Sequence, residues 1–331
     1  MHSNNQVYFV TGAAGFIGSY LCRALLKKTP AARVIGVDNI NGYYNKKIKL
    51  RRIKELSKNS RFIFYKTSIL EKNTIRSITE KHKPSVLIHA AAEVGVRNGE
   101  LHPLEYFSTN VIGTLNVLCA TVPYIQHAVV FSSSSVYGST KHLPFRESEP
   151  IAPSMQLSIY GASKFAMEVA VQSFYNRTKI PITIVRPFSI YGPDGRPDML
   201  PIKLLLAAKT NTPIDVYAPT KSFRDWTYID DCVGVVLSML EKPHRIQIIN
   251  IGNGRPVRLD AILRTSQKIL QHYGYSIPYK PKPANSTEIL KTRADTTRMS
   301  GIYRLPEKTA YKEGFMKTAE FFFSHLNLYI S

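Results

Sequence analysis

The stretch that decides the fold is Val7-Tyr8-Phe9-Val10-Thr11-Gly12-Ala13-Ala14-Gly15-Phe16-Ile17-Gly18. Its apolar first part predicts a buried strand, and its evenly spaced glycines predict a tight turn. An amphipathic helix is predicted next, because apolar residues recur on one helical face at Phe16, Ile17, Tyr20, Leu21, Ala24 and Leu25. Residues 33–37 predict a second strand, which ends at Asp38. Strand, turn, helix and strand together form the βαβ unit of a parallel α/β sheet.

This unit has the features of a dinucleotide site. Gly12, Gly15 and Gly18 let the backbone approach a pyrophosphate, which then lies at the N-terminus of the helix. Asp38 lies 20 residues after Gly18, where a carboxylate can accept hydrogen bonds from the adenosine ribose. The same carboxylate repels a 2′-phosphate, and Asn39 follows it in place of an arginine, so NAD is favoured over NADP. A glycine-rich turn without a ligand is the alternative.

Further strands are predicted at residues 61–65, 86–92, 128–131, 182–186 and 246–251. Helical periodicity recurs between them, and we expect helices at about 103–122 and 159–177. The predicted fold class is therefore α/β, a Rossmann-type doubly wound parallel sheet with a smaller α/β substrate domain at the C-terminal side. The cofactor domain is expected at residues 1–188, completed by about 225–251, and the substrate domain at 189–224 and 252–331.

Two features follow predicted strands, at the sheet edge where open α/β folds place their ligands. One is the serine run Ser132-Ser133-Ser134-Ser135, and the other is Tyr160 with Lys164, four residues apart on one face of a predicted helix. An ammonium beside a phenol lowers the pKa of the phenol, which makes it a general base for a substrate hydroxyl. Ser133 would hold the same oxygen. Tyr-x-x-x-Lys alone also occurs on ordinary surface helices, and its position after the serine run is what favours catalysis. His89, in another predicted strand, is expected to be structural.

Composition limits the classes of function. A hydrophobic content of 44% and a charged content of 20% are typical of a globular protein, and no apolar run is long enough to span a bilayer. Cys22, Cys119 and Cys232 lie in apolar stretches, which predicts buried thiols in a reducing cytoplasm, without a disulfide frame or a metal set. The N-terminus leads directly into the first strand, so no signal peptide is expected.

The formal net charge is +21, and residues 46–66 contain nine basic residues against Glu55 as the one acid. A surface for nucleic acid or an anionic membrane is one interpretation. The other is a solvated helix face on a basic enzyme whose ligands are anionic. The second is favoured, because no nucleic-acid-binding motif or aromatic interleaving accompanies the charge.

Together these motifs resemble the NAD-dependent epimerase/dehydratase family of extended short-chain dehydrogenases/reductases. The resemblance covers almost the whole chain and rests on the glycine turn, Asp38, Ser133 and the Tyr160/Lys164 pair, in that order. It implies catalytic roles for Tyr160, Lys164 and Ser133. It also implies contacts to NAD at Gly12, Gly15, Phe16, Ile17, Gly18, Asp38, Asn39, Ser68, Ile69, Ala90, Ala91, Ala92, Asn110, Tyr160 and Lys164.

Within the family, three stretches are similar to the UDP-glucuronate 4-epimerases. They are Asp38-Asn39-Ile40-Asn41-Gly42-Tyr43-Tyr44-Asn45, Gly95-Val96-Arg97 and Tyr191-Gly192-Pro193-Asp194-Gly195-Arg196-Pro197-Asp198-Met199. The resemblance implies that Arg196 and Ser189 hold a substrate carboxylate, which suits the bidentate geometry of arginine. It further implies that a UDP-sugar substrate is contacted by Arg97, Ser134, Ser135, Ser189, Arg196, Arg224 and Glu288, with Arg224 on the diphosphate.

Several positions depart from the family pattern. Ser68 stands where the family often has an aspartate that holds the adenine, and Thr287-Glu288 stands in place of a Gly-Asp that binds the uridine ribose. Asp194 replaces a tryptophan, and its carboxylate would repel an acidic sugar unless it points away or pairs. Sugar dehydratases and decarboxylases of the family carry acids at Ser134 or Ser135, so the serines favour epimerisation.

The resemblance therefore implies C4 epimerisation of a UDP-hexuronic acid, UDP-glucuronate to UDP-galacturonate, through a 4-keto intermediate with tightly bound NAD. It also implies a homodimer formed through the helices near 103–122 and 159–177, with no specific nucleic-acid or membrane partner. The alternatives are a UDP-glucose/UDP-galactose 4-epimerase or another nucleotide-sugar epimerase, a dehydrogenase that releases its NADH, and a non-catalytic NAD-binding protein with a basic interaction surface.

Overall fold

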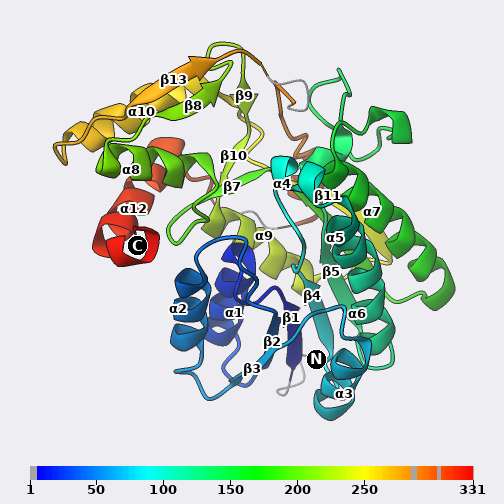
Figure 1. The fold of residues 1–331 in the computed structure, drawn as a ribbon. Helices are drawn as coiled ribbons and strands as arrows, with labels where there is room; N and C mark the ends of the chain where they lie inside the picture. The colour runs from blue at the N-terminus through cyan, green and yellow to red at the C-terminus, as the bar shows by residue number, and fades with distance from the viewer. Residues whose placement is uncertain (1–5, 285–288, 304–306, 331) are drawn as a thin grey trace.

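The computed structural model describes residues 6–284, 289–303 and 307–330. At its centre is a seven-stranded parallel sheet in the order β11-β6-β5-β4-β1-β2-β3 (Figure 1). The strands are β1 (Val7–Thr11), β2 (Arg33–Asp38), β3 (Phe62–Lys66), β4 (Val86–His89), β5 (His127–Phe131), β6 (Ile182–Pro187) and β11 (Ile246–Ile251). The strand order reverses between β1 and β4, and doubly wound sheets bind ligands at such a point. The predicted fold class is confirmed.

Helices cover both faces of this sheet (Figure 1). On one face lie α1 (Phe16–Lys28), α2 (Lys46–Leu56) and α9 (Ile229–Glu241). On the other lie α3 (Lys72–His82), α6 (Thr114–Thr121) and α7 (Ile159–Thr178). Successive side chains of a strand point to opposite faces, so Val10 belongs to the first core and Phe9 to the second. Strands buried on both faces are nearly continuous apolar runs, which is why the sequence predicts them.

The single helix expected at residues 103–122 is interrupted. α4 (Val96–Leu101) and α5 (Pro103–Phe107) lead into a π-helical turn, Ser108–Gly113, before α6 begins. Asn110 lies fully buried in that turn, and its amide nitrogen donates to the Ser163 hydroxyl at 2.9 Å and to the Glu93 carbonyl oxygen at 3.1 Å. The wider turn gives one polar side chain two partners on neighbouring elements.

Smaller elements lie beyond the carboxyl ends of the central strands (Figure 1). Two-stranded sheets pair β7 (Ser189–Tyr191) with β10 (Trp226–Tyr228), β9 (Phe223–Arg224) with β12 (Val257–Arg258), and β8 (Ile214–Tyr217) with β13 (Tyr279–Lys282). The helices of this part are α8 (Leu200–Thr210), α10 (Leu259–Gln271), α11 (Thr297–Ile302), α12 (Tyr311–Ser324) and α13 (Leu326–Tyr329). Together they cover the edge of the sheet at which a ligand is expected.

The basic segment is partly structural, although Lys46, Lys47, Lys54, Lys58 and Lys66 are exposed. Lys49 and Arg52 of α2 are buried, and the Arg51 side chain is 22% exposed. Arg61 donates to carbonyl oxygens in and just after the last turn of α1, those of Leu26, Thr29 and Ala32. The favoured interpretation of a solvated helix face is therefore wrong for these residues, because their charges bind other parts of the fold.

The three cysteines are free thiols. Cys22 and Cys232 are buried as expected, and burial raises the pKa of the Cys232 thiol to about 12. Cys119 on α6 is exposed, so the prediction of a buried thiol is wrong there. Within the described residues, no helix combines the length and the apolar character that crossing a bilayer requires.

Candidate active site

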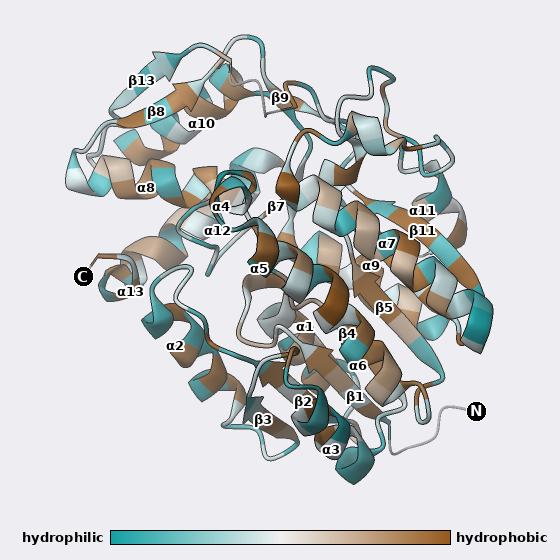
Figure 2. Ribbon diagram, turned by 45° about the vertical axis from the view of Figure 1, so that its right-hand side comes forward, coloured by the Kyte–Doolittle hydropathy of each residue, from teal (hydrophilic) through white to brown (hydrophobic). Residues whose placement is uncertain are grey.

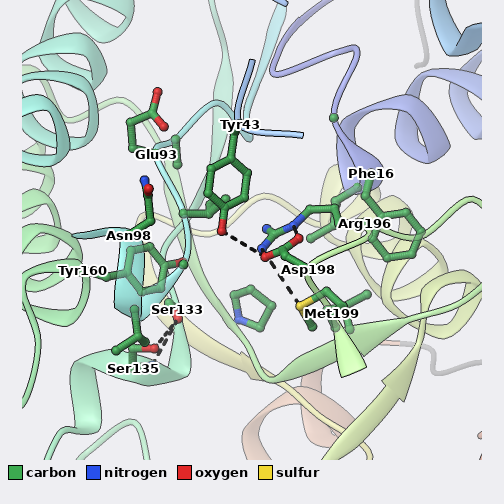
Figure 3. Close-up of a pocket in the computed structure, with 18 of the residues that line it drawn as sticks. Phe16, Tyr43, Glu93, Asn98, Ser133, Ser135, Tyr160, Arg196, Asp198 and Met199 are labelled. Carbon is green, nitrogen blue, oxygen red and sulfur yellow. Dashed lines mark hydrogen bonds and ion pairs between the residues drawn. The ribbon is translucent and has the colours of Figure 1, made fainter. Parts of the chain in front are cut away.

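A cavity of about 660 Å³ lies between the carboxyl edge of the central sheet and the smaller sheets (Figure 3). Its lining comes from the glycine turn, the ends of β2, β4 and β5, the first turn of α7, the loop after β7, and β8 to β10. Segments far apart in the sequence therefore meet around one space.

The glycine turn lies at one end of this cavity. Gly12 has φ +72°, and a Cβ on it would lie 2.7 Å from the backbone nitrogen of Ala91, so the position requires glycine. In the part of the chain that the structure describes, no side chain caps the N-terminus of α1. The first N–H groups of a helix need acceptors, and Gly15, Phe16 and Ile17 line the cavity at this point. Such an end suits a pyrophosphate.

Asp38 connects the end of β2 to the glycine turn. Its two carboxylate oxygens accept hydrogen bonds from the backbone nitrogens of Ile40 at 2.7 Å and Ala14 at 3.1 Å. Each oxygen has a second acceptor site, and Asp38 lines the cavity. So do further residues for which cofactor contacts are expected, namely Gly18, Asn39, Ser68, Ile69, Ala90, Ala91 and Ala92. The carboxylate can therefore still accept from a ribose.

Asn110 has a different place. It is fully buried, and its amide oxygen accepts from the Glu93 backbone nitrogen at 2.9 Å while its nitrogen donates to Ser163. The structure thus uses this side chain to hold the segment after β4 against α7, and it does not line the cavity. The expectation of a direct cofactor contact does not fit this position.

The expected catalytic side chains reach the cavity from α7 and from the end of β5. α7 begins where the Ser158 hydroxyl accepts a hydrogen bond from the Gly161 backbone nitrogen at 3.1 Å. Tyr160 is therefore in the first turn, with its ring edge-to-face on Tyr106 at a centroid distance of 6.2 Å. The Ser133 hydroxyl donates to the Ser135 hydroxyl at 3.1 Å, and Figure 3 shows Ser133 beside the Tyr160 phenol.

Burial raises the pKa of Tyr160, and the Ser133 hydroxyl beside it and the charge of Arg196 partly lower it. Lys164 is buried one turn further along α7, where its ammonium donates to the Phe131 carbonyl oxygen at 2.8 Å. The expectation that Lys164 lowers the pKa of the phenol is not met in this arrangement, since the ammonium binds the end of β5. Burial also lowers the pKa of Lys164 to about 8, and the charge of Glu168 opposes this effect.

A buried ion pair stands behind these residues. Glu168 accepts from Arg186 Nε at 2.9 Å and Nη2 at 2.7 Å, and from the Ser132 hydroxyl at 2.5 Å. The pair therefore fixes the start of the serine run to both α7 and β6. The sequence signal that could have indicated a role for Glu168 is its position one helical turn after Lys164.

His89 is structural, as expected. It is 1% exposed, and its ring nitrogens hydrogen-bond with the hydroxyls of Thr11 at 2.8 Å and Thr114 at 2.9 Å. Burial lowers the pKa of His89 to about 3, so the ring stays neutral. It therefore joins β1, β4 and α6.

Arg196 lies across the cavity, on the loop after β7 (Figure 3). Its guanidinium forms a bidentate pair with Asp198, with Nε to Oδ1 at 2.9 Å and Nη2 to Oδ2 at 2.6 Å. Asp198 also accepts from the Tyr43 hydroxyl at 3.0 Å, and the guanidinium lies 5.6 Å from the centre of the Tyr43 ring. No hydrogen bond within the described residues involves Nη1 of Arg196. That end of the guanidinium remains for a ligand.

The other residues expected at the substrate also line the cavity, namely Arg97, Ser134, Ser135, Ser189 and Arg224. Arg224 donates to the Leu290 carbonyl oxygen at 2.8 Å, and the Arg97 guanidinium lies 4.6 Å from the centre of the Tyr217 ring. Thr287 and Glu288 lie outside the described residues. Tyr43 and Asp198, from the stretches that carry the resemblance, also line the cavity, as do Glu93, Asn98 and Trp226, which have no separate signal in the sequence.

Known proteins are similar to this chain over most of its length. The model of the NAD dependent epimerase/dehydratase family matches residues 8–252. The chain belongs to this family. The family predicted from the glycine turn, Asp38, Ser133 and the Tyr160/Lys164 pair is therefore confirmed.

Individual relatives of the family extend over nearly the whole chain. A UDP-glucuronate 4-epimerase of Thermodesulfobacterium geofontis is 32% identical over 313 residues, which cover 94% of each chain. The solved UDP-glucuronic acid 4-epimerase of Bacillus cereus, in complex with UDP-glucuronic acid and NAD, is 30% identical with a TM-score of 0.88, over 96% of this chain and 99% of that one. The UDP-glucose 4-epimerase of Thermotoga maritima, solved with UDP-glucose, is 25% identical with a TM-score of 0.85, over 97% and 100%.

Proposed function

We propose that this protein is a UDP-hexuronic acid 4-epimerase that interconverts UDP-glucuronate and UDP-galacturonate through a 4-keto intermediate. The observation that carries the proposal is that Arg196 lines the same cavity as Tyr160 and Ser133. A cation across from a proton acceptor suits a sugar with a reacting hydroxyl on one carbon and a carboxylate on the next. The complex of the Bacillus cereus epimerase with UDP-glucuronic acid and NAD supports the same substrate and cofactor.

We assign NAD to the glycine-turn end of the cavity. The uncapped N-terminus of α1 suits its pyrophosphate, and Asp38 suits its adenosine ribose. NAD supplies the acceptor, and then the donor, of the hydride at C4. Since epimerisation returns the hydride to the same carbon, no external oxidant or reductant is consumed.

The residues of this chain handle the proton. Tyr160 takes the proton of the sugar 4-hydroxyl and returns it after the keto sugar has presented its other face. Ser133 and Arg196 both lower the pKa of Tyr160 against the effect of burial, which favours the phenolate. Ser133 also donates to the 4-oxygen as it becomes a carbonyl. Lys164 donates to the Phe131 carbonyl oxygen and so holds the strand end that leads to Ser133 against α7.

Arg196 and Ser189 act on the carboxylate. The 4-keto intermediate is a β-keto acid, which readily loses carbon dioxide. Arg196 and Ser189 prevent this loss by keeping the carboxylate anionic and its C–C bond out of line with the carbonyl π system. Arg196→Ala is expected to release a UDP-pentose by-product and to lose the preference for UDP-glucuronate over UDP-glucose, measured by chromatography of the product sugars. An unchanged preference with no by-product contradicts this role.

The remaining assignments follow from the same substrate. Arg224 binds the diphosphate and Glu288 the uridine ribose, so residues 189–224 and 252–331 act as the substrate domain over a cofactor domain of residues 1–188. The working form is a cytoplasmic homodimer. Exposed apolar side chains on α4 and α5 support the dimer, among them Leu101 and Leu104.

A UDP-glucose 4-epimerase is the second candidate. Asp198 already neutralises Arg196, so an uncharged sugar does not leave the arginine as an unpaired buried charge. The Thermotoga maritima enzyme binds UDP-glucose. Parallel assays with UDP-glucuronate and UDP-glucose distinguish the two candidates, since we expect clear preference for the acid.

A further inference from the structure

Asp194 lies two residues before Arg196 on the loop between β7 and α8, and its side chain is turned into the protein. It is 1% exposed, and its φ of +60° is in the left-handed region, where aspartate and asparagine are tolerated better than most residues. The family residue that the sequence resemblance implies here is a tryptophan. A carboxylate in its place has to find cations, because an unpaired buried charge is costly.

Three arginines surround this carboxylate. Arg23 Nη2 and Arg52 Nε each lie 3.1 Å from Asp194 Oδ2, and Arg51 forms a third ion pair with it. Arg52 is completely buried, Arg51 is 22% exposed and Arg23 is 38% exposed. Asp194 therefore does not act as a repelling charge toward the cavity, since its charge is used in binding α1 and α2.

The backbone beside Asp194 is held as firmly as its side chain. Three consecutive carbonyl oxygens, those of residues 193–195, accept hydrogen bonds from three different elements. Tyr20 of α1 donates to the first at 2.9 Å, Arg52 of α2 donates to the second, and Tyr329 of α13 donates to the third at 3.2 Å. The next residue is Arg196, so the segment that carries the proposed carboxylate ligand is fixed immediately before it.

Arg52 connects this loop to the opposite end of the cavity. Its Nη1 donates to the Ala14 carbonyl oxygen, within the glycine turn, at 3.0 Å and to the Tyr44 hydroxyl at 2.7 Å. One buried guanidinium thus binds both the dinucleotide turn and Asp194. The contacts of this one buried side chain therefore connect the cofactor end of the cavity to the carboxylate end.

We propose that Asp194 is a positioning residue: through Arg52 and its neighbours it fixes Arg196 relative to the glycine turn and thereby sets the preference for a sugar that carries a carboxylate. This inference rests on the proposed function above. A bidentate arginine–carboxylate contact depends on orientation, and a misplacement of about 1 Å can cost up to about 100-fold in rate. Loss of the Asp194 charge removes the ion pairs to α1 and α2 and loosens the loop, which its backbone hydrogen bonds alone then hold, while Arg196 itself is unchanged.

Asp194→Asn tests the proposal, because asparagine keeps the size and tolerates the same φ while removing the charge. The NAD-loaded enzyme is titrated with UDP-glucuronate and, separately, with UDP in a calorimeter. We expect about tenfold weaker binding of UDP-glucuronate and binding of UDP within about twofold of wild type. As the binding of UDP-glucuronate weakens, we expect its KM to rise, while the KM for UDP-glucose is unchanged. Equal losses for both ligands, or no loss for either, overturn the proposal.

Two further variants keep the test decisive. Tyr329→Phe removes the hydrogen bond to the carbonyl oxygen of residue 195 and leaves every buried charge in place, so we expect it to fold even if Asp194→Asn does not. We expect a smaller loss of affinity than in Asp194→Asn, for UDP-glucuronate and not for UDP. Glu80→Gln, which breaks a surface pair with Arg76 on α3, is the control and changes neither affinity. Unchanged UDP-glucuronate binding in Tyr329→Phe contradicts the proposal. If the wild-type enzyme binds UDP-glucuronate without epimerising it, the proposed function is contradicted instead. The ratio of the dissociation constants of variant and wild type still tests this inference.

Discussion

Tyr160 is placed by contacts from three neighbouring elements. Ser158 starts α7, the Tyr106 ring of α5 packs against the phenol ring, and Ser133 at the end of β5 lies beside the phenol. Because none of these three elements belongs to the smaller sheets, the position of the phenol does not depend on those sheets. A substitution that removes only the hydroxyl should therefore leave the fold intact.

Tyr160→Phe is expected to fold, to bind NAD and to turn over at least about 100-fold more slowly, because it removes the general acid–base. Steady-state assay with UDP-glucuronate measures the rate. Tyr175→Phe is the matched control, since Tyr175 lies 15 residues further along the same helix, packs against the core and does not line the cavity. Turnover of Tyr160→Phe close to that of Tyr175→Phe would refute the assignment.

The burial of Lys164 makes the unfolding free energy of the protein depend on pH. Burial lowers its pKa from 10.5 to about 8 in the folded protein, whereas the unfolded chain keeps the ordinary value. Between these two pH values the unfolded chain binds more protons than the folded one, so raising the pH stabilises the fold. Relative to Lys164→Met, wild type should gain on the order of 3 kcal/mol of unfolding free energy across this window.

Denaturant titrations of wild type and Lys164→Met at a series of pH values give this difference, because the other titrating groups are common to both proteins. A difference that is constant with pH, or that falls from pH 8 upward, shows that Lys164 is not desolvated in the fold.

Helices and strands differ in how well the sequence predicts them. The central strands are apolar runs followed by turns, and α1 shows a clear periodicity, so their bounds are close to those expected. The π-helical turn at Ser108–Gly113 has no such signal, because it depends on what Asn110 meets on α7 and after β4. Contacts between distant segments decide it, and these are absent from any local pattern.

The same distinction applies to the site. The glycine turn, Asp38, Ser133 and Tyr160 line the cavity as expected, because each ends a strand or begins a helix at the ligand edge of the sheet. The contact of Asp198 with Tyr43 and the pairing of Asp194 with α1 and α2 were beyond prediction, because the partners come from distant parts of the chain.

Asn110→Ala tests the π-helical turn as an element. The substitution removes three hydrogen bonds, two to the backbone of Glu93 and one to the Ser163 hydroxyl, so we expect about 2–3 kcal/mol lower unfolding free energy. Asn116→Ala is the control, because Asn116 makes only longer hydrogen bonds, of 3.3 Å and 3.5 Å, near the surface. Equal stability of the two variants in denaturant titrations argues against a structural role for the turn.

At the scale of the whole molecule, the described residues include an apolar face that is exposed. Leu101, Leu104, Ile112 and Val169 are each more than half exposed, and they lie on α4, α5, the π-helical turn and α7, which pack together. Figure 2 shows α5, in brown, at the surface beside α7. Apolar side chains gathered on adjoining elements favour association with a second copy, in agreement with the proposed homodimer.

Leu104→Glu is expected to convert the dimer to a monomer, because it introduces a charge at the centre of this face. Sedimentation velocity at micromolar concentration measures the change. Leu143→Glu is the control, since Leu143 is exposed on a loop away from α4 to α7. A wild-type protein that sediments as a monomer contradicts the dimer.

The central claim is that one cavity combines a phenol-based proton acceptor with an arginine that holds a sugar carboxylate. The most direct test is to incubate the purified protein with UDP-glucuronate and to analyse the products by chromatography and NMR. The account predicts an equilibrium mixture of UDP-glucuronate and UDP-galacturonate, formed without net consumption of NAD. Recovery of unchanged UDP-glucuronate from NAD-loaded enzyme, or a UDP-pentose as the main product, would contradict it.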